Sequence, residues 1–203
     1  MNIELDTNIV TFIGPPDSGK STLVKRMLTY PEYRSHLVYD PLFGFDPSIH
    51  NVITPPTTET KFRRYEKGNP ELNTAVDDFI INAKPENRPK IFVVDEAGRL
   101  LPNHKDEGGP MGELNDFNEH YGVGVWLLAQ RHTQINTDFE NKATHHFITG
   151  YKGKNDKRNL DDLHENAQEY VDAQSEYGFT YIGPNGKIQN FAAIEPFGEK
   201  SML

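Results

Sequence analysis

The sequence predicts an α/β fold in which a mostly parallel β-sheet is covered by helices on both faces. Short apolar runs of strand length alternate along the chain with segments whose apolar residues have helical spacing. A glycine-containing turn separates the first such strand from the first such helix, which is typical of phosphate-binding folds. The chain has 203 residues, enough for one such domain, so we expect residues 1–203 to form a single domain.

Apolar runs predict the strands of this sheet at 8–13, 36–39, 91–94, 123–129 and 145–150. The runs at 91–94 and 123–129 are apolar throughout, as expected for parallel strands that are buried on both faces. His145 and His146 are neighbours on a predicted strand, so their side chains should point to opposite faces and cannot bind one metal ion together.

Helical spacing predicts helices at 19–29, 71–84, 112–120, 137–143 and 155–173. In the second of these helices the side chains expected to point inward are Leu72, Val76, Phe79 and Ile80. Residues 177–197 are expected to form a terminal β-hairpin around the turn at 184–186, because Asn-Gly favours tight hairpin turns.

Composition excludes several classes of protein. The 30 acidic and 21 basic side chains leave a formal charge of −9, which argues against a surface that coats nucleic acid everywhere but allows a local basic groove. The absence of cysteine excludes disulfides, thiol catalysis and cysteine-based zinc sites. No apolar run approaches the roughly 20 residues that span a bilayer, so we expect no integral membrane segment.

The strongest motif is Gly-Pro-Pro-Asp-Ser-Gly-Lys-Ser-Thr at 14–22, which matches the phosphate-binding loop of P-loop NTPases. In such loops backbone N–H groups point at the phosphates, and the following helix adds positive potential. Lys20 would reach the β- and γ-phosphates, and the Ser21 hydroxyl would bind Mg²⁺. The residues expected to hold the nucleotide are Gly14, Asp17, Ser18, Gly19, Lys20, Ser21 and Thr22.

Asp17 departs from the glycine that many such loops carry at its position, although aspartate tolerates the left-handed backbone better than most residues. The alternative interpretation of the whole motif is a chance turn containing glycine and lysine. The apolar strand before it and the amphipathic helix after it favour the phosphate loop.

Two carboxylates, Asp95 and Glu96, follow the apolar run at 91–94. At the carboxyl edge of a parallel sheet they would face the phosphate loop. Asp95 would then hold Mg²⁺, and Glu96 would orient and activate the attacking water. The alternative is an ordinary strand-to-loop transition, where acidic residues are common.

Gln130 and Arg131 follow the run at 123–129. If that strand neighbours the first one, Gln130 lies near the γ-phosphate; otherwise it is a polar residue that ends a buried strand. Ring-forming ATPases often use an arginine from a neighbouring subunit to neutralise transition-state charge. Arg99, Arg131 and Arg158 are candidates for this role because each follows a strand end, and a solvated surface charge is the alternative for each.

These residues together resemble the FtsK/HerA superfamily of DNA-pumping ATPases, and among them the small genome-packaging ATPases of icosahedral viruses with an internal membrane. The discriminating segments are the strand ending Leu-Leu-Ala-Gln-Arg at 127–131 and the Asp-Pro segment at 40–45. The segment at 147–160 is similar to the fifth strand of that superfamily and places Arg158 on its conserved arginine. His132 departs from the proline that is common after the Gln-Arg pair.

The resemblance implies a RecA-like P-loop ATPase of the ASCE type that binds ATP and Mg²⁺ and moves double-stranded DNA through a homo-oligomeric ring, which we expect to be a hexamer. It also implies packaging of a viral genome into a preformed capsid, with capsid vertex or membrane proteins as partners. The expected location is the host cytoplasm or the virion.

A motor needs a few cations on loops that face its DNA. Candidate contacts are Arg63 and Arg64 in the irregular segment before residue 71, Lys105 in the loop after the acidic strand end, and Lys154 after the last core strand. A solvated charged face is the alternative for each group.

Two other functions stay open at this stage. A P-loop kinase acting on a small molecule should have a lid rich in arginine and no need of Glu96, whereas the arginines here are scattered. An assembly or morphogenesis ATPase that does not move DNA is the second alternative.

Overall fold

A computed structural model describes residues 5–55, 69–101 and 108–194 of the chain. The strands are β1 (Ile9–Ile13), β2 (His36–Tyr39), β3 (Val52–Ile53), β4 (Ile91–Val94), β5 (Gly124–Ala129), β6 (His145–Ile148), β7 (Phe179–Gly183) and β8 (Lys187–Phe191). Within the described part of the chain they form one sheet in the order β3-β2-β4-β5-β1-β6-β7-β8. The pairs from β3 to β6 are parallel, and β7 and β8 join antiparallel. The predicted mostly parallel sheet is therefore confirmed.

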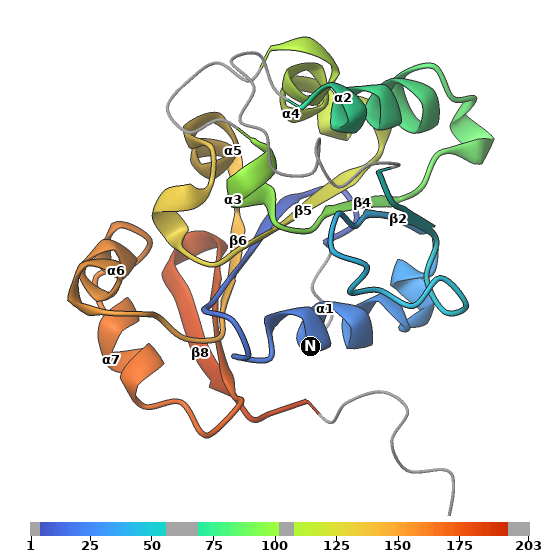
Figure 1. The fold of residues 1–203 in the computed structure, drawn as a ribbon. Helices are drawn as coiled ribbons and strands as arrows, with labels where there is room; N and C mark the ends of the chain where they lie inside the picture. Colours follow the sequence, from blue (N-terminus) through green and yellow to red (C-terminus); the bar gives the residue numbers. More distant parts are fainter. Residues whose placement is uncertain (1–4, 56–68, 102–107, 195–203) are drawn as a thin grey trace, which may run out of the picture.

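The helices are α1 (Lys20–Leu28), α2 (Pro70–Val76), α3 (Ala97–Leu100), α4 (Gly109–Tyr121), α5 (Thr137–Lys142), α6 (Lys154–Asn159) and α7 (Ala167–Asp172). Figure 1 shows α2, α3, α4 and α5 together on one side of the sheet and α1 on the other. Among the described residues no helix combines the length and the apolar character needed to cross a bilayer.

Side chains that alternate along the strands fill two core layers, one on each face of the sheet. Ile9 packs in the layer under α2 to α5, whereas Val10 and Phe12 pack in the layer under α1. Trp126 lies in the α1 layer at 5.3 Å from the ring of Phe12, and its indole N–H donates to the backbone carbonyl of Leu5. The two covered faces explain why the central strands are apolar throughout.

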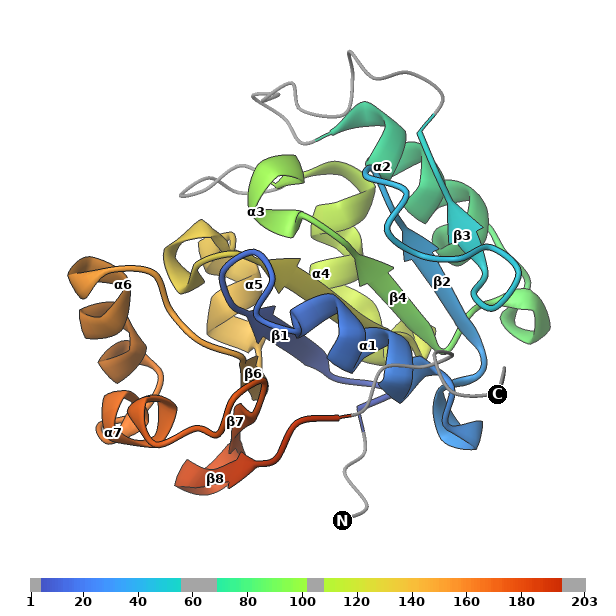
Figure 2. The ribbon, with the colours of Figure 1, turned by 60° about the horizontal axis from the view of Figure 1, so that its bottom comes forward.

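The predicted terminal hairpin is confirmed in its described part. β7 pairs with β6 and β8 pairs with β7, joined by a turn in which Asn185 has a φ of 62°. Figure 2 shows the hairpin extending the sheet beyond β6, at the end opposite β3. The short strand β3 is an element that the sequence did not predict, because two residues are too few to show a period.

The inward position predicted for Phe79 is wrong, since its side chain is exposed. Residues Asp77–Ile81 form a π-helical turn in which the N–H of Asn82 donates to the carbonyl of Asp77. The wider turn changes the direction of the side chains within it, so Ile80 is buried and Phe79 is not.

The single helix predicted at 155–173 is also wrong. The structure has α6, a 3₁₀ turn at Leu160–Asp162 and then α7. Aspartate and asparagine are poor helix formers in this stretch, and the His164 ring bonds the backbone N–H of Asn166 between the two helices. Leu160, Ala167 and Val171 still point into a common apolar cluster, which is why the sequence showed a continuous apolar stripe.

Candidate functional site

The phosphate loop connects β1 to α1 at the carboxyl edge of the sheet (Figure 2). Gly14 passes so close to the end of β6 that a Cβ atom there would lie 2.0 Å from the Oγ1 atom of Thr149. Asp17 and Gly19 both have left-handed backbone, with φ of 62° and 88°. Asp17 therefore adopts the left-handed backbone that glycine has at this position in many such loops.

The Lys20 side chain is buried at the start of α1 and lies over this loop. Its Nζ atom donates to the Gly14 carbonyl at 3.4 Å. Burial lowers the pKa of Lys20, while the nearby charges of Asp95 and Glu96 act in the opposite direction. A buried ammonium with one weak partner is well suited to bind a polyanion.

Asp95 and Glu96 lie at the end of β4, as predicted, and Asp95 is buried. Desolvation raises the pKa of Asp95 to about 6, and the like charges of Asp40 and Glu96 add to this shift. The backbone N–H of Glu96 donates to Asp95 Oδ1 at 3.0 Å. Glu96 itself has a φ of 54°, a strained conformation for a residue other than glycine and one that recurs at functional sites.

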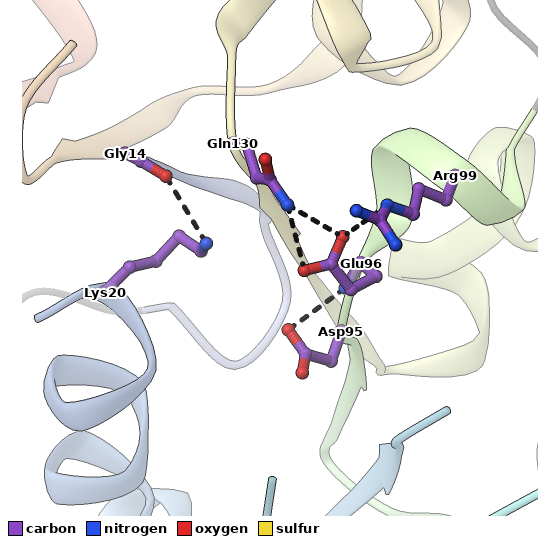
Figure 3. A network of polar contacts seen from close by, with 6 residues as sticks. All are labelled: Gly14, Lys20, Asp95, Glu96, Arg99 and Gln130. Atoms are coloured by element: carbon purple, nitrogen blue, oxygen red, sulfur yellow. Dashed lines mark hydrogen bonds and ion pairs between the residues drawn. The ribbon is translucent and has the colours of Figure 1, made fainter. Parts of the chain in front are cut away.

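The Glu96 carboxylate is held by two side chains of its own chain (Figure 3). Gln130 Nε2 lies 3.4 Å from both carboxylate oxygens, and Arg99 Nε lies 3.2 Å from one of them. Glu96 directly precedes α3 and Arg99 lies three residues further on, so the contact has i, i+3 spacing at the start of the helix. The acid is therefore oriented by one amide and one cation.

A cleft of about 270 Å³ brings these groups together, lined by the loop residues from Pro15 to Thr22 and by Glu96 and Gln130. The strand order explains why the phosphate loop, Glu96 and Gln130 lie close together. β5 lies between β1 and β4, and Gln130 directly follows the end of β5. The structure thus fulfils the condition that the sequence left open, since the 123–129 strand lies beside the first strand. Carboxyl ends of parallel strands converge on one edge, where ligands bind in open α/β folds.

The other predicted cations are placed differently. Arg131 forms an ion pair with Asp156 of the same chain at 3.5 Å. Arg158 and Lys154 are exposed on α6 and do not line the cleft. The candidate DNA contacts Arg63, Arg64 and Lys105 lie outside the described residues.

Two residues without a predicted role support the site. Asp40 is fully buried after β2, and its carboxylate accepts the backbone N–H groups of Leu42 at 3.0 Å and Phe45 at 2.8 Å. Thr149 Oγ1 lies 2.6 Å from Ser18 Oγ and joins β6 to the phosphate loop. The Asp-Pro pair at the end of β2 is a sequence signal for Asp40. No local pattern in the sequence indicates the role of Thr149.

The residues present fit a magnesium ion. The Ser21 hydroxyl and the Asp95 carboxylate are hard oxygen donors, and a cation would offset the desolvation and, with it, the repulsion from Asp40 and Glu96 that raise the pKa of Asp95. No group of three or more histidine or acidic side chains in the described ranges could hold a metal ion alone. Mg²⁺ usually keeps several waters and binds through one or two protein groups and the substrate phosphates, a pattern that the Ser21 and Asp95 donors match.

The sequence matches no protein-family model, and no curated protein is significantly similar to it in sequence. Solved structures do match. B204, the DNA-packaging ATPase from Sulfolobus Turreted Icosahedral Virus, superposes with a TM-score of 0.75 over 93% of this chain and 98% of that chain, at 19% identity. The chain has the fold of a P-loop NTPase.

Other structures agree with this fold. The genome packaging NTPase B204 from Sulfolobus turreted icosahedral virus 2, in complex with AMPPCP, gives a TM-score of 0.72 over 94% of this chain and 99% of that chain, at 17% identity. The pCW3 conjugation coupling protein TcpA, with ATPgS, gives 0.61 over 95% of this chain and 62% of that chain, at 16% identity. The structural neighbours of this P-loop NTPase fold are thus of the kind that the sequence resemblance predicted.

Proposed function

We propose that the chain is an ATP-hydrolysing double-stranded DNA translocase that packages a viral genome into a preformed capsid. The observation that carries the proposal is the cleft in which the phosphate loop faces Glu96 and Gln130. The similarity in fold to B204, a DNA-packaging ATPase, supports double-stranded DNA as the molecule that is moved. The chain would hydrolyse ATP to move DNA. Its active form would be a homo-oligomeric ring, for which we propose a hexamer. A capsid vertex or membrane protein is the proposed docking partner, and the virion or host cytoplasm the proposed location.

The phosphates of ATP would occupy the loop from Gly14 to Thr22, with Lys20 turning from the Gly14 carbonyl toward the β- and γ-phosphates. Ser21 and Asp95 would hold Mg²⁺, which neutralises phosphate charge when bound. Glu96 would then accept a proton from the water that attacks the γ-phosphorus, while Gln130 keeps its carboxylate oriented.

The placement of the described arginines favours hydrolysis over phosphotransfer to a small molecule. In the described part of the chain no arginine lines the cleft, whereas a kinase lid would bring several arginines over the phosphates. Two of the three candidate trans-acting arginines, Arg99 and Arg131, are paired with acids of their own chain. Arg158 is therefore the candidate that we propose for the role in trans.

Steady-state ATP hydrolysis with and without double-stranded DNA tests the proposal. We expect stimulation by DNA at low salt and weaker stimulation as salt rises, because the contacts would be to phosphates. Lys20→Ala should abolish ATP binding, and Lys90→Ala, at an exposed lysine before β4, is its matched control. Hydrolysis that DNA does not change at low salt would contradict translocation and favour an assembly ATPase. Phosphate transfer to a small molecule in place of release would favour the kinase.

A further inference from the structure

A second cavity, of about 480 Å³, adjoins the phosphate cleft. Asp17, Gly19 and Thr22 line both spaces, so the second cavity begins where the phosphate loop ends. Its volume lies in the range of small-molecule sites, roughly 300–1,000 Å³. A ligand whose phosphates occupy the loop would place the rest of its body here.

The far wall of this cavity is apolar and comes from three separate parts of the chain. Leu23 belongs to α1, Tyr177 lies in the turn before β7 and Phe179 begins that strand, and Ala193 and Ile194 follow β8. These elements meet because the terminal hairpin extends the sheet past β6, next to the phosphate loop. Such a wall suits a flat, weakly polar ring.

Tyr177 is the distinctive residue of this wall. Its side chain is 62% exposed, and its φ of 56° is rare for an aromatic residue. A Cβ atom at Gly19 would lie 3.9 Å from Tyr177 Cδ1, so the ring borders the phosphate loop. A strained aromatic residue held at the rim of a cavity is a stacking surface rather than a part of the core.

Few polar side chains in the cavity are free to recognise the edge of a base. Thr149 Oγ1 already bonds the Ser18 hydroxyl at 2.6 Å and the Ile13 carbonyl at 3.3 Å. Asp17 and Thr22 belong to the phosphate loop, and no asparagine, glutamine, lysine or arginine of the described residues lines the space. A site that holds a ring by apolar contact discriminates between rings by only about 10–200-fold, whereas one built on hydrogen bonds reaches 10⁴–10⁵.

We propose that this cavity binds the base and ribose of the nucleoside triphosphate, that Tyr177 stacks on the base, and that the site accepts purine and pyrimidine nucleotides alike. The inference rests on the proposed function, because it takes the phosphate loop to hold a triphosphate. It adds the substrate class, which is any of the four common nucleoside triphosphates rather than ATP alone.

Titration calorimetry of the full chain with ATP, GTP, CTP and UTP tests the breadth of the site. We expect dissociation constants within about tenfold of one another, as apolar recognition allows. A preference for one base above about 200-fold would overturn the inference and leave the proposed hydrolase intact.

Tyr177→Ala tests the stacking role. Loss of one stacked aromatic ring should weaken binding of all four nucleotides by at least about fivefold, and Tyr177→Phe should restore it. Binding of inorganic tripolyphosphate, which has no base, should be the same in all three proteins. Phe117→Ala is the matched control, because Phe117 is an exposed aromatic residue on α4 that lies outside the cavity.

Two results separate the failure of this inference from the failure of the proposed function. If Tyr177→Ala weakens tripolyphosphate as much as it weakens ATP, the ring supports the phosphate loop and the base-stacking inference is wrong. If wild type binds neither tripolyphosphate nor any nucleotide, the phosphate loop does not hold a triphosphate, and both proposals are wrong.

Discussion

Replacing Arg99 by glutamine tests whether this arginine acts within its own chain on Glu96. The pair is separated by 3.2 Å, and the two side chains are 49% and 13% exposed. Because one partner is half in solvent, the contact should contribute about 0.3–1 kcal/mol to the position of the carboxylate. That corresponds to a change in hydrolysis rate of about two- to fivefold. An arginine that neutralises the transition state from a neighbouring subunit would be worth about 10³–10⁵.

The assay is kcat and KM for ATP with saturating double-stranded DNA, measured for wild type, Arg99→Gln and Arg99→Lys. We expect a change in kcat below about fivefold with KM unchanged, and Arg99→Lys to lie between the other two. Arg34→Gln, at an exposed arginine before β2, is the matched control for loss of one surface charge. A loss of 10³ or more in Arg99→Gln would refute the positioning role and make Arg99 the arginine that acts in trans.

Three further results are expected. Arg158→Ala subunits should be inactive alone and regain activity when mixed with Lys20→Ala subunits, because the interface at which an Arg158→Ala subunit supplies the loop and a Lys20→Ala subunit supplies the arginine is intact; no recovery would remove Arg158 from that role. Burial lowers the pKa of His146 to about 4. In the unfolded chain the histidine pKa is near 6.5, so between about pH 6.5 and pH 4 the unfolded state binds a proton at His146 that the folded state does not. The contribution of His146 should therefore lower the free energy of unfolding by about 3 kcal/mol as the pH drops from about 6.5 to about 4. His146→Gln should make this fall shallower in a denaturation series but not remove it, because burial also lowers the pKa of His36, His50 and His145; an unchanged slope would contradict the contribution of His146. Asp40→Ala leaves the buried N–H group of Phe45 and the part-buried N–H group of Leu42 without their acceptor and should lower the free energy of unfolding by about 1–3 kcal/mol, against less than about 0.5 for exposed Asp162→Ala.

The parts of the site that lie in one local motif could be predicted from the sequence. The loop from Gly14 to Thr22 and the acidic end at Asp95 and Glu96 depend on short-range spacing, so their positions on the strand edges follow directly. Gln130 could be predicted only conditionally, because its place depends on which strand neighbours β1. The structure supplies that order.

Other features depend on contacts that no local pattern carries. The π-helical turn that exposes Phe79 and the break between α6 and α7 replace regular helix with geometry that apolar spacing does not reveal. The ion pair of Arg99 with Glu96 has a local signal in its i, i+3 spacing. Tyr177 is far from the phosphate loop in the sequence, so only the three-dimensional hairpin brings the two together.

The central claim is that Glu96 activates the water that attacks the γ-phosphate of ATP bound in the cleft. Single-turnover hydrolysis of ATP by Glu96→Gln tests this claim most directly. Glutamine keeps the size of the side chain and removes its ability to accept a proton. We predict a rate at least about 100-fold below wild type, with ATP affinity retained and exposed Glu119→Gln indistinguishable from wild type. Hydrolysis by Glu96→Gln at the wild-type rate would contradict the account.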